Sequence, residues 1–315
     1  MDKNKKIFVA GNRGMTGSAI VRLLQTEGYT NLLLKSRSEL DLCSQQAVNA
    51  FFKQEKPDYV FLAAAKVGGI QANIRQPAEF LYENLMIQNN VIHAAYMNGV
   101  TKLCFLGTSC IFPKNTQQPM KEDQLLSGYL EDTNEAYALA KIAGLKLVSY
   151  LRREYGFNGV SIMPCNLYGT NDHFDLQQSH VLSALIRKFV DAVDNNDENV
   201  TVWGSGKARR EFMHVDDCAR AAIFVMEHYD GEQFINVGWG TDVSIKELAE
   251  IIGKKTGFHG NIIFDISRPD GMMQKCLDVT RMRNIGFTPR IDLDEGIART
   301  IMEYRALKAA GKIDR

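Results

Sequence analysis

The sequence lacks the long apolar runs and the charge imbalance that mark several classes of protein. Hydrophobic residues make up 45% of its 315 residues, yet no run approaches the roughly 20 apolar residues of a membrane span. Its 37 basic residues balance 37 acidic ones, so no global positive field gathers nucleic acid. We therefore expect an ordinary globular protein that binds neither membrane nor nucleic acid.

Paired cysteines are also missing. The six cysteines stand singly without a C-x-x-C pair, which fits neither a disulfide framework nor a zinc site. They are Cys43, Cys104, Cys110, Cys165, Cys218 and Cys276. The opening MDKNKKIFVAGNRG has neither the apolar stretch nor the cleavage site of a signal peptide. We expect free thiols, no bound metal and a cytoplasmic location.

Short β-rich runs alternate with longer helical patterns over the first two-thirds of the chain. This alternation is typical of βαβ units in a parallel sheet covered on both faces. The predicted strands are Lys6 to Ala10, Asn31 to Lys35, Tyr59 to Ala63, Lys102 to Leu106 and Gly159 to Met163. The predicted helices are Gly17 to Glu27, Ser44 to Glu55, Asn84 to Asn98 and Glu135 to Glu154. The fold class is therefore α/β, a Rossmann-type doubly wound parallel sheet.

A second, smaller region follows Met163, where the pattern loosens into loops and short mixed elements. Its predicted elements are a helix over His180 to Ala192, a solvated loop over Asp191 to Asn199, a helix over His214 to His228 and a strand over Gln233 to Val237. We expect a sheet domain of residues 1–165 and 214–240. The remaining residues, 166–213 and 241–315, then form a discontinuous α/β substrate domain.

A glycine-rich turn follows the first predicted strand. Gly11, Gly14 and Gly17 stand in G-x-x-G-x-x-G spacing between that strand and a helix. Glycines there allow a tight turn and a close approach of backbone to a pyrophosphate, which the helix N-terminus attracts. The turn predicts a dinucleotide site; the plain alternative is a glycine turn that binds nothing.

Two arginines indicate which dinucleotide binds. Arg37 stands at the end of the second predicted strand, where NAD-specific enzymes generally carry an acidic residue. A guanidinium there suits the 2′-phosphate of NADP, and Arg13 in the glycine turn supplies a second one. The alternative for each arginine by itself is a charged side chain that faces solvent and binds nothing, but the placement of both favours NADP(H).

Three kinds of polar group converge on the end of a central strand. Thr108, Ser109 and Cys110 follow the strand that ends at Leu106, where ligands bind in open α/β sheets. Tyr137 and Lys141 lie four apart, so both side chains project from one helix face. A Y-x-x-x-K motif alone is weak evidence for a catalytic site, but the glycine turn and the strand-end hydroxyl make that evidence stronger. These residues alone predict a reductase or epimerase of a hydroxyl or keto group.

The motifs resemble the short-chain dehydrogenase/reductase superfamily and, within it, the GDP-L-fucose synthases. The resemblance rests on GNRGMTGSAI, AAAKVGGI, ENLMIQNNVIHAA, LGTSCIFPK, NEAYALAK, NLYGTND, HVLSALIRK, VWGSGKARREFMHVDD and RPDGMMQK, and it spans nearly the whole chain. Such enzymes convert GDP-4-keto-6-deoxy-D-mannose to GDP-L-fucose by epimerising C3 and C5 and then reducing C4 with NADPH. The same activity is what the resemblance implies here.

For the reduction, the resemblance implies that Tyr137 protonates the C4 oxygen as hydride arrives. Lys141 would hold the nicotinamide ribose, and its charge would lower the pKa of the phenol toward neutrality. Thr108 would hydrogen-bond the keto oxygen, at a position where the family usually has serine.

For the epimerisation, Cys110 matches the proposed base of the family and His180 the proposed acid. Thiol and imidazole pKa values of about 8.5 and 6.5 both suit proton transfer near neutral pH. Without the resemblance, Cys110 reads as a buried strand-end thiol and His180 as an ordinary residue at a helix N-terminus.

The resemblance also implies a set of contacts to cofactor and substrate. The cofactor contacts are Gly11, Asn12, Arg13, Gly14, Met15, Gly17, Arg37, Leu106, Gly107, Lys141, Pro164, Asn166, Leu167 and His180. The substrate contacts are Ser109, Lys188, Trp203, Arg210 and Asp278. Lys188 departs from the arginine of the best-known members, which puts bidentate phosphate recognition in doubt. Trp203 is otherwise a partly buried core aromatic, and Asp278 a plain N-cap.

The family forms homodimers through a four-helix bundle, which implies that the helices Asn84 to Asn98 and Glu135 to Glu154 pair with their symmetry mates. Helices that cover each other within one chain are the plain alternative.

Two rival functions remain open. One is a UDP-sugar 4-epimerase that retains NAD, against which Arg37 and the pair Cys110 and His180 argue. The other is a catalytically silent NADP-binding sensor, which the intact Thr108, Tyr137 and Lys141 make a poorer fit.

Overall fold

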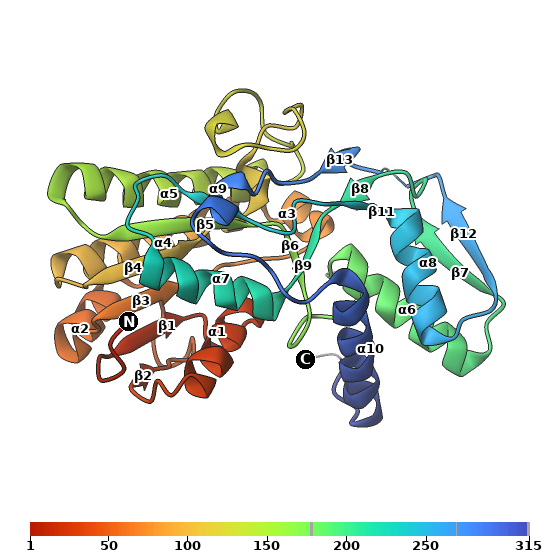
Figure 1. Ribbon diagram of the computed structural model, residues 1–315, viewed down its shortest axis with the longest axis horizontal. Helices are drawn as coiled ribbons and strands as arrows, with labels where there is room; N and C mark the ends of the chain where they lie inside the picture. Colours follow the sequence, from red (N-terminus) through yellow and green to blue (C-terminus); the bar gives the residue numbers. More distant parts are fainter. Residues whose placement is uncertain (177–178, 269, 314–315) are drawn as a thin grey trace.

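A parallel sheet forms the centre of the larger region. The computed structural model describes residues 1–176, 179–268 and 270–313. Within that part, one sheet holds six parallel strands in the order β10-β5-β4-β3-β1-β2 (Figure 1). They are β1 (Ile7–Ala10), β2 (Leu32–Leu33), β3 (Tyr59–Leu62), β4 (Lys102–Leu106), β5 (Gly159–Pro164) and β10 (Ile235–Val237). β4 and β5 are buried along their whole length, as a sheet covered on both faces requires. The predicted doubly wound fold is confirmed.

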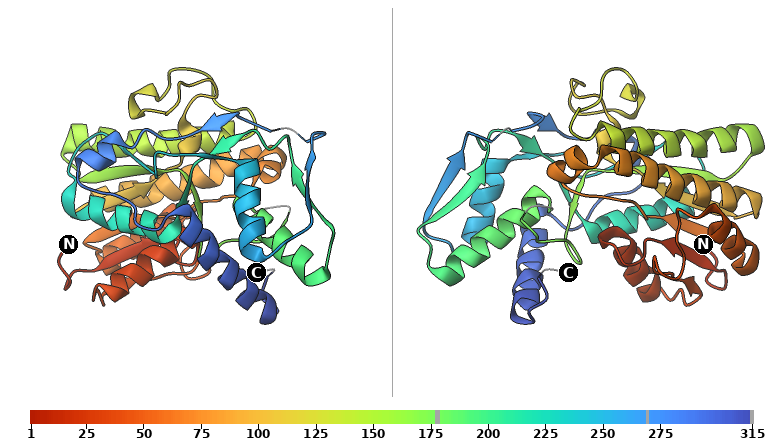
Figure 2. Two further views of the ribbon diagram at one scale, coloured as in Figure 1. Left: turned by 45° about the vertical axis from the view of Figure 1, so that its right-hand side comes forward. Right: turned by 180° about the vertical axis from the view of Figure 1, so that it is seen from behind.

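Helices cover both faces of this sheet (Figures 1 and 2). On one face α1 packs against α7, and on the other α4 packs against both α2 and α5. The helices are α1 (Met15–Thr26), α2 (Gln45–Glu55), the short α3 (Ile70–Arg75), α4 (Pro77–Met97), α5 (Glu135–Tyr155) and α7 (Val215–His228). Single 3-10 turns, η1 (Ser109–Ile111) and η2 (Glu122–Gln124), follow β4.

Two predicted boundaries in this region are wrong. The strand expected over Asn31 to Lys35 is reduced to Leu32–Leu33, a short strand at the edge of the sheet. The helix expected from Asn84 begins at Pro77 instead. Proline suits the first turn, because its missing N–H would be unpaired there, and Glu79 complements the positive end of the helix.

The smaller region is built from short strands and three longer helices within the described residues (Figure 1). β7 pairs with β12, β6 pairs with β9, and β8 lies between β11 and β13. The strands are β6 (Asn166–Tyr168), β7 (Asn199–Trp203), β8 (Arg209–Arg210), β9 (Phe212–His214), β11 (Val243–Ser244), β12 (Asn261–Asp265) and β13 (Gln274–Lys275). The helices are α6 (Val181–Asn195), α8 (Ile245–Thr256), α10 (Leu293–Ala309) and the single-turn α9 (Thr280–Asn284).

The solvated loop predicted over Asp191 to Asn199 is wrong. α6 continues to Asn195 and β7 begins at Asn199, so only residues 196–198 connect them. Asp191 lies on the helix and accepts a hydrogen bond from the Tyr304 hydroxyl at 3.0 Å and one from Lys308 at 2.5 Å. The polar residues here therefore anchor α6 to α10 rather than form a loop.

Two separate clusters of buried apolar residues lie in the two regions. The first surrounds the central sheet and includes residues of α1, α4, α5 and α7. The second lies among α6, α8 and α10. Leu277, Met282 and Phe287, from a segment expected in the substrate domain, belong to the first cluster. The exact division of the chain into the two predicted domains stays a prediction.

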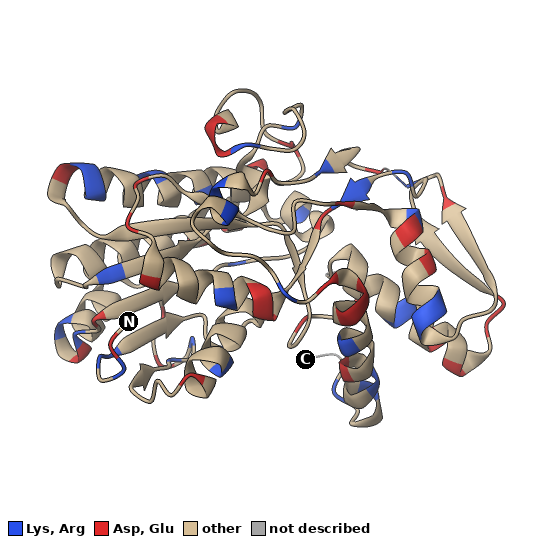
Figure 3. Cartoon of the chain, in the orientation of Figure 1, with Lys and Arg blue, Asp and Glu red and all other residues tan. Residues whose placement is uncertain are grey.

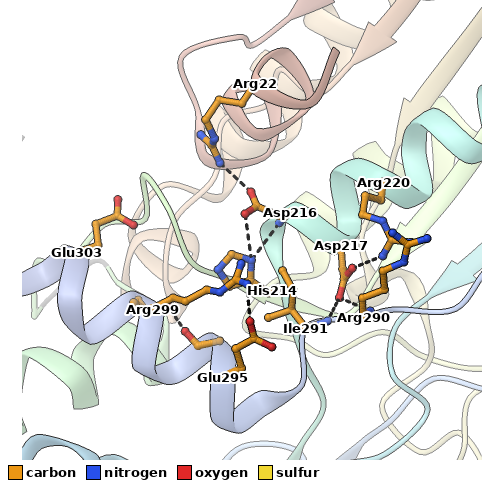
Figure 4. Close-up of polar contacts among 12 residues, drawn as sticks. Arg22, His214, Asp216, Asp217, Arg220, Arg290, Ile291, Glu295, Arg299 and Glu303 are labelled. Carbon is orange, nitrogen blue, oxygen red and sulfur yellow. Dashed lines mark hydrogen bonds and ion pairs between the residues drawn. The ribbon is translucent and has the colours of Figure 1, made fainter. Parts of the chain in front are cut away.

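Polar contacts join α1, α7 and α10 where the two regions meet (Figure 4). Arg22 of α1 pairs with Asp216 at 2.9 Å. The neighbouring carboxylate, Asp217, is fully buried and accepts from the backbone N–H groups of Arg290 and Ile291 at 2.8 and 2.7 Å. This carboxylate fixes the segment that leads into α10, and it satisfies the buried N–H of Ile291.

Basic and acidic residues are interspersed over both regions (Figure 3). Among the described helices, none is both long and apolar enough to cross a membrane. The only fields available to bind an anion are therefore local ones, at helix ends and at particular side chains.

Candidate active site

The glycine turn between β1 and α1 has no room for side chains. Gly11 has φ +84°, and a Cβ there would lie 2.6 Å from the Ala64 backbone nitrogen. A Cβ on Gly17 would lie 2.1 Å from the Gly11 carbonyl oxygen. Gly14 is the N-cap of α1, whose first N–H groups have no capping side chain. The turn therefore brings bare backbone and the positive end of a helix to the carboxyl edge of the sheet.

Asn12, inside this turn, fits a bound polar group. Its side-chain oxygen is buried and has no hydrogen-bond partner. Buried polar oxygens without partners are rare in folded proteins, and they often mark the position of a ligand or water. Together with the uncovered helix N-terminus, this oxygen makes the turn suitable for a dinucleotide.

Arg13 and Arg37 both reach solvent beside the turn. The Arg37 side chain is 79% exposed, and its guanidinium lies 3.4 Å from the Glu83 carboxylate of α4. Glu39, which follows β2, is close enough to Arg13 that the arginine contributes to lowering the pKa of that carboxyl, after hydrogen bonds from Ser36 and the charge of Lys35. Arg13 and Lys35 therefore both lie near the Glu39 carboxylate, whereas Arg37 lies beside Glu83 of α4.

The other residues expected to contact the cofactor stand at the ends of neighbouring strands. Leu106 and Pro164 end β4 and β5, and Gly107 donates its N–H to Ile162 at 2.9 Å. A Cβ on Gly107 would lie 2.1 Å from the Met163 sulfur, so a larger residue there would displace the end of the Met163 side chain. Asn166 and Leu167 begin β6. Met15 is the first residue of α1.

Tyr137 and Lys141 lie on α5 beneath the end of β4. Lys141 is buried, its ammonium donates to the Leu106 carbonyl at 2.9 Å, and it lies 5.9 Å from the centre of the Tyr137 ring. Thr108, the N-cap of η1, accepts a hydrogen bond from the Cys110 backbone N–H at 3.3 Å. β4, η1 and α5 therefore place a hydroxyl, a phenol and an amine at one edge, as the sequence predicted.

The expected effect of Lys141 on Tyr137 is wrong for this state of the protein. Burial raises the pKa of Tyr137 well above its ordinary value, and the nearby Cys110 raises it further. Burial also lowers the pKa of Lys141 to about 7. Desolvation is the largest cause of both shifts, so the phenol holds its proton at neutral pH.

Cys110 has two side-chain neighbours that sequence reasoning missed. Its sulfur accepts from the ammonium of Lys275 at 3.3 Å and from the amide of Asn134 at 3.6 Å. Burial raises the pKa of the thiol, but the charge of Lys275 and hydrogen bonds from Thr108 and Lys275 outweigh it, so the pKa is lowered overall. Asn134 begins the motif NEAYALAK and Lys275 ends the motif RPDGMMQK, but sequence reasoning gave neither residue a role in the site.

His180 is not brought against Cys110. It is the exposed N-cap of α6, and no contact between the two side chains occurs in the described part of the chain. Its charge acts on Asp172, whose pKa is raised by burial, while a hydrogen bond from Ser183 and the charge of His180 oppose that rise.

Trp203 ends β7 and is 52% exposed, so it is not the core aromatic of the plain alternative. The ammonium of Lys188 lies 5.2 Å from the centre of its indole ring, and the guanidinium of Arg268 lies 5.1 Å from it. Lys188 also donates to the Thr201 carbonyl at 2.9 Å, and burial lowers its pKa. An exposed indole between two cations is a surface on which a planar anionic ligand can stack.

Arg210, Ser109 and Asp278 complete the predicted set. Arg210 donates to the Asp270 carbonyl at 3.3 Å, and burial lowers the pKa of its guanidinium. Ser109 is buried in η1. Asp278 accepts from the Thr280 backbone N–H at 2.8 Å, the local contact that its plain alternative anticipates. In the described chain, no group of three or more His, Cys, Asp or Glu side chains could hold a metal ion.

Comparison with known proteins gives consistent matches along the chain. The model of a family described as the NAD dependent epimerase/dehydratase family matches residues 7–238. The putative GDP-L-fucose synthase 2 of Arabidopsis thaliana is 53% identical over 96% of this chain and 93% of its own length. The GDP-L-fucose synthase of Escherichia coli (strain K12) is 51% identical, over 94% of this chain and 95% of its own.

A solved structure is similar over its full length. It is the GDP-mannoheptose C4 reductase MlghC from Campylobacter jejuni with NADP bound, 41% identical to this chain with a TM-score of 0.91. The match covers 97% of this chain and 99% of that one.

Burial of Lys141 lowers the free energy of unfolding of the protein near neutral pH, because the side chain must be desolvated on folding. Its pKa falls from 10.5 to about 7 on folding, so between these values the unfolded chain binds more protons than the folded one, and stability rises with pH. We expect Lys141→Met to increase the free energy of unfolding at pH 7. The gap to wild type should narrow by up to about 1.4 kcal/mol per pH unit as pH rises toward 10.

Urea unfolding of both proteins at pH 7, 8 and 9 checks this. Lys146→Met, at a half-buried lysine on the same helix, is the matched control and should leave a gap that does not depend on pH. A gap for Lys141→Met that stays constant over this range would contradict the lowered pKa.

Proposed function

Because this chain belongs to the NAD-dependent epimerase/dehydratase family, we propose that it converts GDP-4-keto-6-deoxy-D-mannose to GDP-L-fucose with NADPH. The observation that carries the proposal is one edge of the sheet where a phenol, a buried amine, a hydroxyl and a thiol with a lowered pKa lie together. Relatives 53% and 51% identical over nearly the whole chain carry the name GDP-L-fucose synthase. The enzyme is thus an oxidoreductase with epimerase activity.

The protein uses NADP(H), and the residues of the glycine turn fit it. The backbone of Gly11, Gly14 and Gly17 would face the pyrophosphate, and Arg13 and Arg37 the 2′-phosphate. Bound NADPH supplies the hydride for reduction. Leu106, Gly107, Pro164, Asn166 and Leu167, with Asn12, Met15 and His180, would line the rest of the path, where the strand ends place them.

In the reduction, Tyr137 donates its phenolic proton to the C4 oxygen. Burial supports this role, because a phenol with a raised pKa is protonated at neutral pH and has a proton to give. The Thr108 hydroxyl orients the same oxygen from the end of β4. Lys141 would hold the ribose by hydrogen bonds to its hydroxyls.

In the epimerisation, Cys110 removes a proton from C3 or C5 and His180 returns one to the opposite ring face. The C4 ketone makes those protons acidic, and the negative charge rests on its oxygen between the two steps. Base and acid must lie on opposite sides of a sugar ring. The absence of a direct contact between the two side chains in the described structure is compatible with that arrangement.

At the far end of the substrate, Trp203 and Lys188 would bind the GDP moiety. The exposed indole offers a stacking face, and Lys188, Arg210 and the further cation Arg268 supply positive charge for the diphosphate. Lys188 cannot bind a phosphate in the bidentate way of an arginine, but the guanidinium of Arg268, which also lies near Trp203, can do so. Ser109 and Asp278 remain proposed sugar contacts.

A second candidate is a C4 reductase of another GDP-sugar without epimerase activity. The similar Campylobacter jejuni enzyme carries such a name. The lower identity of that relative, 41% against 53%, and the thiol of lowered pKa favour the bifunctional enzyme.

Product analysis tests the proposed function. We expect purified protein given GDP-4-keto-6-deoxy-D-mannose and NADPH to consume the cofactor and to release GDP-L-fucose, identified by NMR. Tyr137→Phe should lose at least about a hundredfold in reduction, the usual scale of general acid catalysis, while NADPH binding is unchanged. Cys110→Ser should halt solvent deuterium uptake at C3 and C5.

The outcomes separate the candidates. An unepimerised 6-deoxy sugar would select the plain reductase, and no NADPH consumption would reject both. Full turnover by Tyr137→Phe would remove this residue from the mechanism.

Arg37 should decide between NADPH and NADH. Loss of charge-assisted hydrogen bonds worth about 1.5–3 kcal/mol predicts that Arg37→Ala raises KM for NADPH by roughly 10- to 100-fold. KM for NADH should change little, because that cofactor has no 2′-phosphate. Arg37→Lys keeps the positive charge but loses the bidentate guanidinium, so its KM for NADPH should lie between those of the wild type and Arg37→Ala. An equal rise in KM for both cofactors would contradict this, because it would show that Arg37 supports the fold rather than binding the 2′-phosphate.

We also propose that two chains form a homodimer through α4 and α5. Apolar side chains are exposed along these helices, among them Tyr82, Met97, Leu139 and Tyr150. Sedimentation equilibrium should give twice the chain mass of 35.4 kDa, and Tyr150→Asp should give the monomer, because a charge would be buried at the interface. Met302→Asp, at an equally exposed apolar residue of α10, is the control that should stay dimeric. A monomeric wild type would exclude the bundle.

The six cysteines are all free thiols in the structure. Oxidising compartments favour disulfides, so this state supports the proposal that the enzyme works in the cytoplasm.

A further inference from the structure

The sulfur of Cys110 is surrounded by hydrogen-bond donors. The Lys275 ammonium lies 3.3 Å from it and the Asn134 side-chain amide 3.6 Å. A protonated thiol is a weak acceptor, whereas a thiolate accepts several hydrogen bonds and attracts a cation. The arrangement of donors is therefore that of a site for a thiolate.

Lys275 is delivered to this position by a segment fixed on both sides. β13 pairs in parallel with β8, with Lys275 opposite Arg210, and the Lys275 carbonyl accepts from the Glu211 N–H at 3.2 Å. The next residue, Cys276, bonds through its carbonyl to the Met120 N–H at 2.8 Å and through its N–H to the Gln118 side chain at 2.9 Å. The backbone on either side of the lysine is thus held in place.

We propose that Lys275 holds Cys110 as a thiolate before the substrate arrives, so that the base of the epimerisation is already deprotonated. This inference rests on the proposed function for its catalytic meaning, but the ion pair is a property of the protein alone. Lys275 is a positioning residue, because it acts through Cys110 and takes no proton from the sugar.

The surroundings of the pair favour the ionised state. Thr108 and Asn134 face the sulfur with polar groups, and Tyr137, protonated at neutral pH, is the other titratable neighbour. No carboxylate faces the thiol among the described contacts, so nothing competes for the ammonium there. Burial disfavours the thiolate, but the attraction to Lys275 and the hydrogen bonds exceed that cost and lower the pKa of Cys110.

The proton balance of the epimerisation follows from this pair. The thiolate takes the proton from the carbon and becomes a thiol, and the electron pair of the broken C–H bond moves to the C4 oxygen. The Lys275 ammonium keeps its charge throughout and reorganises little, which is the property of a preorganised electrostatic partner. Return of the thiol proton to solvent then restores the ion pair.

Alkylation of Cys110 by iodoacetamide as a function of pH tests the pair without any substrate. The thiolate is the reactive form, so the midpoint of the rate against pH reports its formation. A Cys43→Ser background removes the other partly exposed thiol, and mass spectrometry of the labelled peptide identifies the site. Lys275→Met should raise the midpoint by at least about one pH unit, equal to a tenfold smaller thiolate fraction near neutrality.

Lys275→Arg is the matched control and should keep the low midpoint, since it retains a cation of similar reach. Lys275→Gln gives a second neutral variant if Lys275→Met does not fold, with retained NADPH binding as the check of folding. An unchanged midpoint in a folded neutral variant overturns the proposal, as does a raised midpoint in Lys275→Arg equal to that of Lys275→Met.

A substrate arm distinguishes this inference from the proposed function. With GDP-4-keto-6-deoxy-D-mannose, the neutral variants should lose solvent deuterium uptake at C3 and C5 at pH 7 and regain much of it at pH 9. Lys275→Arg should keep the wild-type pH profile. If wild-type protein takes up no deuterium, the proposed function fails, while the alkylation midpoints still decide whether Lys275 holds the thiolate.

Discussion

The parallel order of the central strands is the constraint on which the site depends. Because every strand points the same way, all their carboxyl ends meet at one edge, and the glycine turn after β1, η1 after β4 and β6 after β5 must lie along it. The strand order therefore brings the cofactor turn and the catalytic edge to the same side of the sheet. The close fit of Gly11 against Ala64 and of Gly17 against Gly11 shows how tightly that edge is packed.

Burial sets the chemistry of this edge, and it acts differently on each group. It keeps the phenol of Tyr137 protonated and brings the pKa of Lys141 down to about 7, because neither side chain has an opposite charge beside it. It fails to neutralise Cys110, because Lys275 lies within hydrogen-bond distance. The proposed acid of the reduction and the proposed base of the deprotonation therefore lie near each other, with pKa values shifted in opposite directions by their surroundings.

The sequence predicted the local parts of this site and missed those that depend on distant segments. Gly11, Gly14 and Gly17, and the spacing of Tyr137 and Lys141, each lie within one turn or helix, so a pattern of a few residues indicates their arrangement. Lys275 lies 165 residues from Cys110, and the pairing of β13 with β8 and the bonds of Cys276 to Gln118 and Met120 position it there. The polar run from Asp191 was misread for the same reason, since its partners lie on α10. The sign of the Tyr137 shift also needed burial, which spacing does not report.

The three-stranded sheet β11-β8-β13 links the two ends of the proposed substrate site. Arg210 of β8 lies in register with Lys275 of β13, so the arginine expected at the diphosphate and the lysine at the thiol are held in one hydrogen-bonded unit. A displacement of this sheet would move both cations together. The strand pairing therefore fixes the spacing of the two cations without any ligand, in keeping with an ammonium that already lies beside the thiol.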